Sequence, residues 1–102
     1  MEASEAEGDR LLQQGLQQNR TSQLRAALNS FQQALQIYRA LKNRQGEAAA
    51  LGNLGVTYFN QGNRTKAIEY LKQSLAIARE IKYRPGEAFT LGNLGYTYVS
   101  VG

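Results

Sequence analysis

The chain has 102 residues, contains no Cys and no His, and carries a formal net charge of +4. This composition excludes disulfide bonds, catalysis by cysteine or histidine, and the usual zinc sites. Hydrophobic residues make up 42% of the sequence, enough for one small domain, but no apolar run is long enough to cross a membrane and no secretory signal is visible, so we expect a cytoplasmic protein.

A short leucine stripe predicts a first helix over residues 2–18, with acidic residues at its start, where the helix dipole favours negative charge. The segment 19–22 (NRTS) reads as a turn, and Thr21 or Ser22 is expected to cap the next helix by accepting a backbone N–H bond. The second helix is predicted over 22–42, from the helical spacing of Leu24, Ala27, Leu28, Phe31, Ala34, Leu35, Tyr38 and Leu41.

Three further helices are predicted over residues 45–60, 64–82 and 86–100. Asn43 either ends the second helix or caps the third, and Asn63 is expected to cap the fourth. The turn before Asn63 contains Gly62, which is free to adopt a positive φ. Pro85, the only proline, is tolerated in the first turn of the fifth helix, where no N–H bond is lost.

The third and fifth helices share a sequence. Residues 46–58 (GEAAALGNLGVTY) return as residues 86–98 (GEAFTLGNLGYTY), with ten of thirteen positions identical. A repeat with a period of forty residues predicts an array of structural units, and the helix pattern makes each unit a pair of helices.

A Gly in the leading helix is followed after twelve residues by Ala and after sixteen by a large apolar residue, at Gly15, Ala27 and Phe31 and again at Gly55, Ala67 and Leu71. This spacing of small residues within the helix pairs resembles that of the tetratricopeptide repeat family. Small residues at these places would let the two helices cross closely. The period and the GNLG motif are similar to a longer-repeat branch found in bacterial arrays and in spindle-orientation adaptors. HEAT and armadillo arrays are the alternative.

The resemblance implies an all-α fold: a right-handed superhelical α-solenoid of five helices in A-B-A-B-A order within one domain, 1–102. Its expected units are a degenerate first repeat, a second repeat and a half repeat with a leading helix alone, at about 5–43, 44–83 and 84–102. Gln14 and Gln18 stand where the second repeat has Leu and Tyr. Polar residues there suit a terminal capping repeat with nothing packed on its outer side, so we expect the array to begin here.

Catalysis is not expected. The motif GNLG has no following Lys and does not follow a strand, so it is not a nucleotide-binding loop. Glu47 and Glu87, one per repeat, are interpreted as first-turn helix acids. We therefore expect a non-enzymatic protein with no cofactor and no metal.

The resemblance also implies that the leading helices line a concave groove that binds a peptide or partner segment. Helical phase selects as groove candidates Asn53, Asn93, Asn60, Val56, Phe59, Phe89, Tyr96 and Gln13. Asn53 and Asn93 recur at one position, and an Asn side chain can both donate to and accept from a peptide bond. The alternative is that Asn53 bonds the neighbouring repeat or water. The nearby Gly52 and Gly92 would leave room either for a ligand or for close stacking of repeats.

The groove is expected to be nearly uncharged, without the Lys and Arg clamp that chaperone-binding members of this family use for a terminal carboxylate. The basic residues are expected on the convex side: Arg64, Lys66, Lys72, Arg79, Lys82 and Arg84. They are interpreted as solvated charges at helix ends, so nucleic acid is an unlikely partner. A second hypothesis is homodimerisation through the fifth helix, whose uncovered apolar stripe is Leu91, Leu94 and Tyr98.

Overall fold

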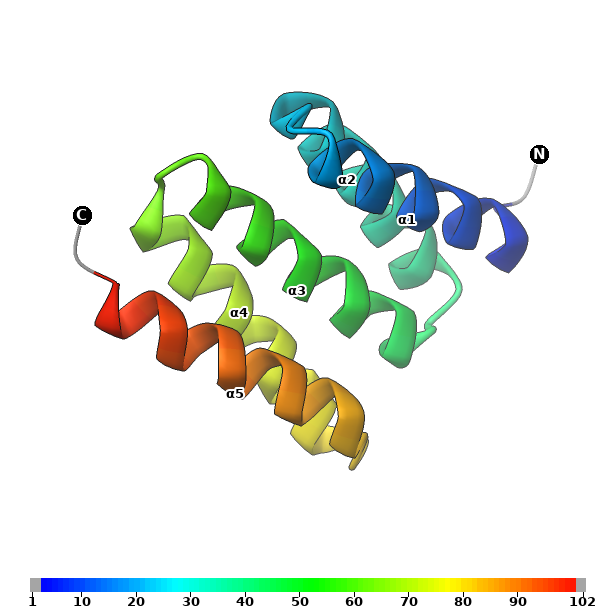
Figure 1. Cartoon of the computed structure of the whole chain (residues 1–102). Coiled ribbons are helices and arrows are strands. Elements are labelled where there is room, and N and C mark those ends of the chain that lie inside the picture. The colour runs from blue at the N-terminus through cyan, green and yellow to red at the C-terminus, as the bar shows by residue number, and fades with distance from the viewer. Residues whose placement is uncertain (1–2, 101–102) are drawn as a thin grey trace.

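The computed structural model describes residues 3–100 and consists of five helices joined by short turns. They are α1 (Glu5–Arg20), α2 (Leu24–Ala40), α3 (Arg44–Asn60), α4 (Arg64–Glu80) and α5 (Arg84–Val99). The leading helices α1, α3 and α5 lie side by side in one layer, and α2 and α4 form a second layer behind them (Figure 1). This confirms the predicted all-α solenoid of about two and a half repeats. The predicted start of the first helix, residue 2, lies outside the described residues.

All four turns close in the same way. Ser22, Lys42, Gly62 and Lys82 adopt positive φ angles of 61°, 56°, 84° and 58°. In each turn the following N–H bonds to the carbonyl five residues back, as Asn43 does to Tyr38 at 2.9 Å. This is the Schellman arrangement, which satisfies the last free carbonyls of a helix. The predicted helix ends at residues 42 and 82 were therefore two residues too late, because the left-handed residue has already left the helix.

The helix caps agree with the predictions at two turns and not at a third. Asn63 accepts from the Lys66 N–H at 3.1 Å, so its predicted cap is confirmed, and of the two roles expected for Asn43 the structure shows the cap, which accepts from the Gly46 N–H at 2.9 Å. The expectation that Thr21 or Ser22 caps the second helix is wrong. Gln23 occupies that N-cap without a side-chain bond, because Ser22 is used as the left-handed turn residue.

Glycine lets the two helices of each pair approach closely. A Cβ built on Gly15 would lie 2.5 Å from Cε1 of the buried Phe31 ring. A Cβ on Gly55 would lie 2.7 Å from Cγ of Leu71 and 3.1 Å from the carbonyl oxygen of Ala67. Ordinary packing requires a larger separation, so these crossings exclude any larger residue. The structure thus gives the predicted small residues their expected role.

The two helices of the first repeat also share a polar contact that the sequence did not reveal. Gln14 donates to the Ser30 hydroxyl at 3.2 Å, and that hydroxyl donates to Oε1 of Gln18 at 2.6 Å. Ser30 belongs to α2 and is only 2% exposed. The two glutamines therefore face their own partner helix. We had expected Gln14 and Gln18 to be polar because nothing packs on the outer side of the repeat. They are instead polar at a contact with α2.

Candidate functional site

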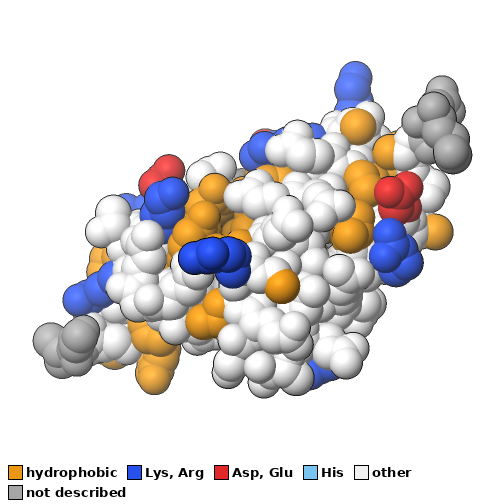
Figure 2. Space-filling view, turned by 90° about the horizontal axis from the view of Figure 1, so that it is seen from above, with side chains coloured by type: hydrophobic (Ala, Val, Ile, Leu, Met, Phe, Trp, Pro, Cys, Tyr) orange, Lys and Arg blue, Asp and Glu red, His pale blue; other side chains and the backbone are white. Residues whose placement is uncertain are grey.

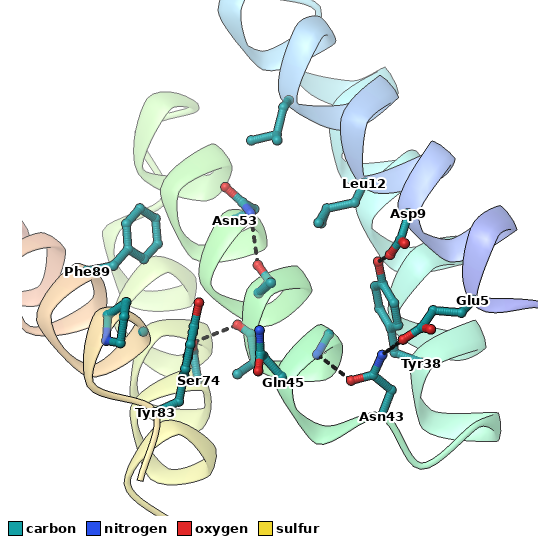
Figure 3. Close-up of a pocket in the computed structure, with 16 residues that line it drawn as sticks. Glu5, Asp9, Leu12, Tyr38, Asn43, Gln45, Asn53, Ser74, Tyr83 and Phe89 are labelled. Carbon is teal, nitrogen blue, oxygen red and sulfur yellow. Dashed lines mark hydrogen bonds between the residues drawn. The ribbon is translucent and has the colours of Figure 1, made fainter. Parts of the chain in front are cut away.

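A groove of about 670 Å3 runs along the layer formed by α1, α3 and α5 (Figure 3). Helix α1 contributes Leu12 and Leu16, α3 contributes Ala49 and Asn53, and α5 contributes Phe89. These side chains come from three successive leading helices, so the groove exists only because the repeats stack side by side. Its surface is mostly apolar and includes a few amide, hydroxyl and carboxyl groups, among them the Asn53 amide between Leu12 and Phe89.

The structure brings together two of the eight groove candidates: Asn53 and Phe89 line the groove. The other six lie outside its lining residues: Asn93, Asn60, Val56, Phe59, Tyr96 and Gln13. Three of these six instead connect leading helices. Asn60 donates to Oδ1 of Asn19 at 3.0 Å, which joins α3 to α1, and the rings of Phe59 and Tyr96 lie 5.3 Å apart, which joins α3 to α5.

Asn53 and Asn93 make the same bond within their own helices. The Asn53 amide donates to the Ala49 carbonyl at 2.9 Å, and the Asn93 amide donates to the Phe89 carbonyl at 2.9 Å. Each side chain is thereby held in one orientation, with its carbonyl oxygen still able to accept further bonds. The two residues are matched in local structure, and only Asn53 lies in the groove.

Gly52 serves the stacking of repeats. A Cβ at this position would lie 3.1 Å from the ring of Phe89 on α5 and 3.2 Å from the hydroxyl of Ser74 on α4. The space beside Gly52 is thus filled by the following helices. The corresponding Cβ on Gly92 would have no neighbour within 4 Å in the described part of the chain.

One wall of the groove is acidic, which corrects the expectation of a nearly uncharged surface. Glu5 and Asp9 of α1 line the groove. The Tyr38 hydroxyl donates to Asp9, and the Asn43 amide donates to Glu5 (Figure 3). Burial, reinforced by the bond to Asp9, raises the pKa of Tyr38 above its ordinary value. Glu5 escaped the sequence argument because it was read only as a helix-dipole charge.

The two repeats cover the start of the leading helix with different tyrosines. In the first repeat the Tyr38 ring, from α2, lies against Gly46 at the start of α3. In the second repeat Ala78 stands at the position equivalent to Tyr38, and the ring of Tyr83 lies against Gly86 instead. Both rings border the groove. No single-position pattern could reveal this exchange, because the tyrosine moves five residues along the repeat.

Four arginines at the junctions between helix pairs form ion pairs with glutamates. Glu47, only 7% exposed, pairs with Arg39 at 3.1 Å and with Arg44 at 2.9 Å. The equivalent Glu87 pairs with Arg79 and Arg84 at 3.0 and 3.3 Å. The interpretation of Arg79 and Arg84 as solvated helix-end charges is therefore incomplete. Each pair of arginines holds one glutamate of the next leading helix.

Arg44 also connects α3 to the end of α4, its partner helix in the second repeat, through Glu80 at 2.8 Å. Hydrogen bonds from Arg44 lower the pKa of the Glu80 carboxyl, so its stabilising contribution is complete above the ordinary Glu pKa and is lost as pH falls through the lowered value. We expect Glu80→Gln to lower the urea midpoint slightly at pH 7, and the difference from the original chain to shrink as the pH falls below the ordinary Glu pKa of about 4.3. Glu69→Gln, at an exposed position of the same helix outside the ion pairs of the described residues, is the control. A deficit that stayed the same size from pH 7 down to pH 2 would contradict the assignment.

The expected self-association stripe is only partly exposed. Leu91 and Tyr98 are 45% and 50% exposed, whereas Leu94 is 7% exposed and packs inward, so it does not belong to an uncovered stripe. Phe89, Tyr96 and Val99 are also exposed on α5. Hydrophobic side chains reach the surface at the left end of Figure 2, the end at which the chain terminates in Figure 1.

Stacked helix pairs with a groove along their leading helices define the class of helical-repeat proteins. A family model for the tetratricopeptide repeat matches residues 10–80 and 46–102, and the chain belongs to that family. A comparison with curated proteins found no match. Members of the family are typically non-enzymatic modules that mediate protein–protein interactions. In the described part of the chain, no helix combines the length and the apolar character needed to cross a bilayer.

Proposed function

We propose that the groove between α1, α3 and α5 binds a short segment of a protein partner. The observation that carries this proposal is a mostly apolar groove of about 670 Å3 with the side chain of Asn53 in its lining. Apolar walls with a few placed polar groups are the usual composition of a binding site. The partner segment inserts apolar side chains between Leu12 and Phe89 and donates a backbone N–H to the carbonyl oxygen of Asn53.

Charge on the groove walls favours one kind of segment. Glu5 and Asp9 lie on the α1 wall, and no Lys or Arg is among the lining residues. A positively charged side chain of the ligand would be attracted to that wall. The proposed ligand is therefore an apolar peptide segment that carries Lys or Arg at the end bound near α1.

Photocrosslinking identifies the partner. A photoreactive phenylalanine analogue at Gln45, which is exposed and borders the groove, should capture the partner in cells of the source organism. The same analogue at Lys72, exposed on α4 and outside the groove lining, should not capture it. Capture at Lys72 alone would place the interaction on the other layer and overturn the groove proposal.

Asn53→Ala and Asn93→Ala then form a matched pair. Both remove the same i−4 bond within a helix, so their effects on helix stability should agree. We expect Asn53→Ala to weaken binding of a peptide from the captured partner about tenfold, the effect of one lost hydrogen bond in a desolvated site, and Asn93→Ala to leave binding within about twofold. Isothermal titration calorimetry measures both. Equal affinities for the two variants would remove Asn53 from the binding site.

A further inference from the structure

A second surface lies on α5 and is separate from the groove. Leu91 and Tyr98 are 45% and 50% exposed, and Gly95 between them is also exposed. In α3 two of the three equivalent residues are buried, Leu51 at 1% exposure and Gly55, and the third, Tyr58, is half-buried. The two helices have the same LGNLG sequence, so the difference comes from what packs against them. We call Leu91, Gly95 and Tyr98 the open face of α5.

Helix α4 shows what such a face accepts. Leu71 and the Ala67 carbonyl lie against Gly55, so α4 presents a small residue followed four positions later by a large apolar one. The Ser74 hydroxyl donates to the Ala48 carbonyl of α3 at 2.7 Å. In the first repeat α2 has the same sequence pattern at Ala27 and Phe31, and the Phe31 ring lies against Gly15. Helices α2 and α4 thus share one sequence pattern, and they cover equivalent faces of α1 and α3.

The start of α5 also carries the same charged residue as the start of α3. Arg44, at the start of α3, holds Glu80 in the last turn of α4 through three hydrogen bonds of 2.8 to 3.1 Å. Arg84 is the equivalent residue of α5, and its side chain is 85% exposed. A helix lying on α5 as α4 lies on α3 would therefore bring its last turn to Arg84, where an acidic residue is favoured.

We propose that the open face of α5 binds an amphipathic helix of a partner protein, antiparallel to α5. That helix carries a small residue opposite Gly95, a large apolar residue four positions later, and an acidic residue in its last turn near Arg84. A second copy of this chain does not offer such a helix. Both of its helices with this pattern are already packed in their own repeats, where Ala27 and Ala67 are 0% exposed.

A peptide with the sequence of residues 63–83 provides the probe, because it contains the pattern that covers α3. We expect the labelled peptide to bind the full chain saturably at one site, measured by fluorescence anisotropy, and to gain helical circular dichroism on binding. Gly95→Leu in the chain should weaken binding at least tenfold. The free chain should tolerate this change, since a Cβ at Gly95 meets no atom within 4 Å in the described part of the chain. Ala67→Leu in the peptide should cause a similar loss.

The charge contact has its own control. Arg84→Gln in the chain and Glu80→Gln in the peptide should each weaken binding about two- to fivefold, and together no more than either alone. The peptide could instead replace α4 of the chain on α3. Its binding would then not change with Gly95→Leu, and that result would overturn the proposal. Absence of saturable binding would also overturn it. So would a dimer of the chain, seen by sedimentation, that Gly95→Leu abolishes while the peptide fails to bind, because the face would then belong to a second copy.

Discussion

Gly55→Ala should destabilise the chain, whereas Gly95→Ala, the same change in the same LGNLG sequence, should stabilise it. At Gly55 the new methyl group would lie 2.7 Å from Leu71 and 3.1 Å from the Ala67 carbonyl, and neither can retreat, because Leu71 is buried and the carbonyl is part of α4. Such overpacking costs about 1–3 kcal/mol. At Gly95 no atom lies within 4 Å in the described residues, so only the gain in helix propensity remains, up to about 1 kcal/mol.

Urea unfolding of the two variants measures this contrast. Helix propensity contributes nearly equally to both, so the difference between their free energies of unfolding reports the packing at the crossing of α3 and α4. Circular dichroism of each folded variant serves as the control that the helices are retained. Equal shifts for Gly55→Ala and Gly95→Ala would show that glycine is not required by the crossing.

Tyr38→Ala should cost about 3–5 kcal/mol, the range for loss of a buried aromatic side chain. The ring is 1% exposed, covers Gly46, and donates its hydroxyl hydrogen bond to Asp9. Asn43→Tyr in the same chain should restore part of this loss, because it recreates the second repeat, where Ala78 is accompanied by a covering Tyr83.

A double-mutant cycle tests this exchange. Asn43→Tyr alone should destabilise by about 1 kcal/mol, since it removes the cap on the Gly46 N–H while Tyr38 still fills the space. We expect the double variant to be at least about 1 kcal/mol more stable than additivity requires. Should Tyr38→Ala fail to fold, recovery of a cooperative urea transition in the double variant gives the same answer. Strict additivity would contradict the exchange.

Local sequence rules predicted most of the helices and their packing. The 3.6-residue spacing located all five helices. Asn43, Asn63 and Gly62 marked turns, because their own side chains, or the lack of one, favour a cap or a positive φ. The failures involve residues whose role is imposed by neighbours. Lys42 has no intrinsic preference for positive φ and adopts it because the turn requires it.

The candidate site was less predictable because it depends on several helices at once. Helical phase placed Asn53 and Phe89 in the groove, but phase within one helix says nothing about where the groove ends along the layer. Asn60 and Tyr96 share that phase and are instead engaged by neighbouring leading helices. The acidic wall requires the register between α1 and α3, which places Glu5 beside Asn43, thirty-eight residues away.

The order of the helices along the chain is also the order of their principal contacts: each packs on the one before and the one after, and leading helices touch at their edges. An arrangement of this kind folds quickly, because few distant segments must meet before stabilising contacts form. It also lets an end detach while the middle stays intact. Helix α5 packs mainly on α4, so a helix bound to its open face would hold it in place from a second side.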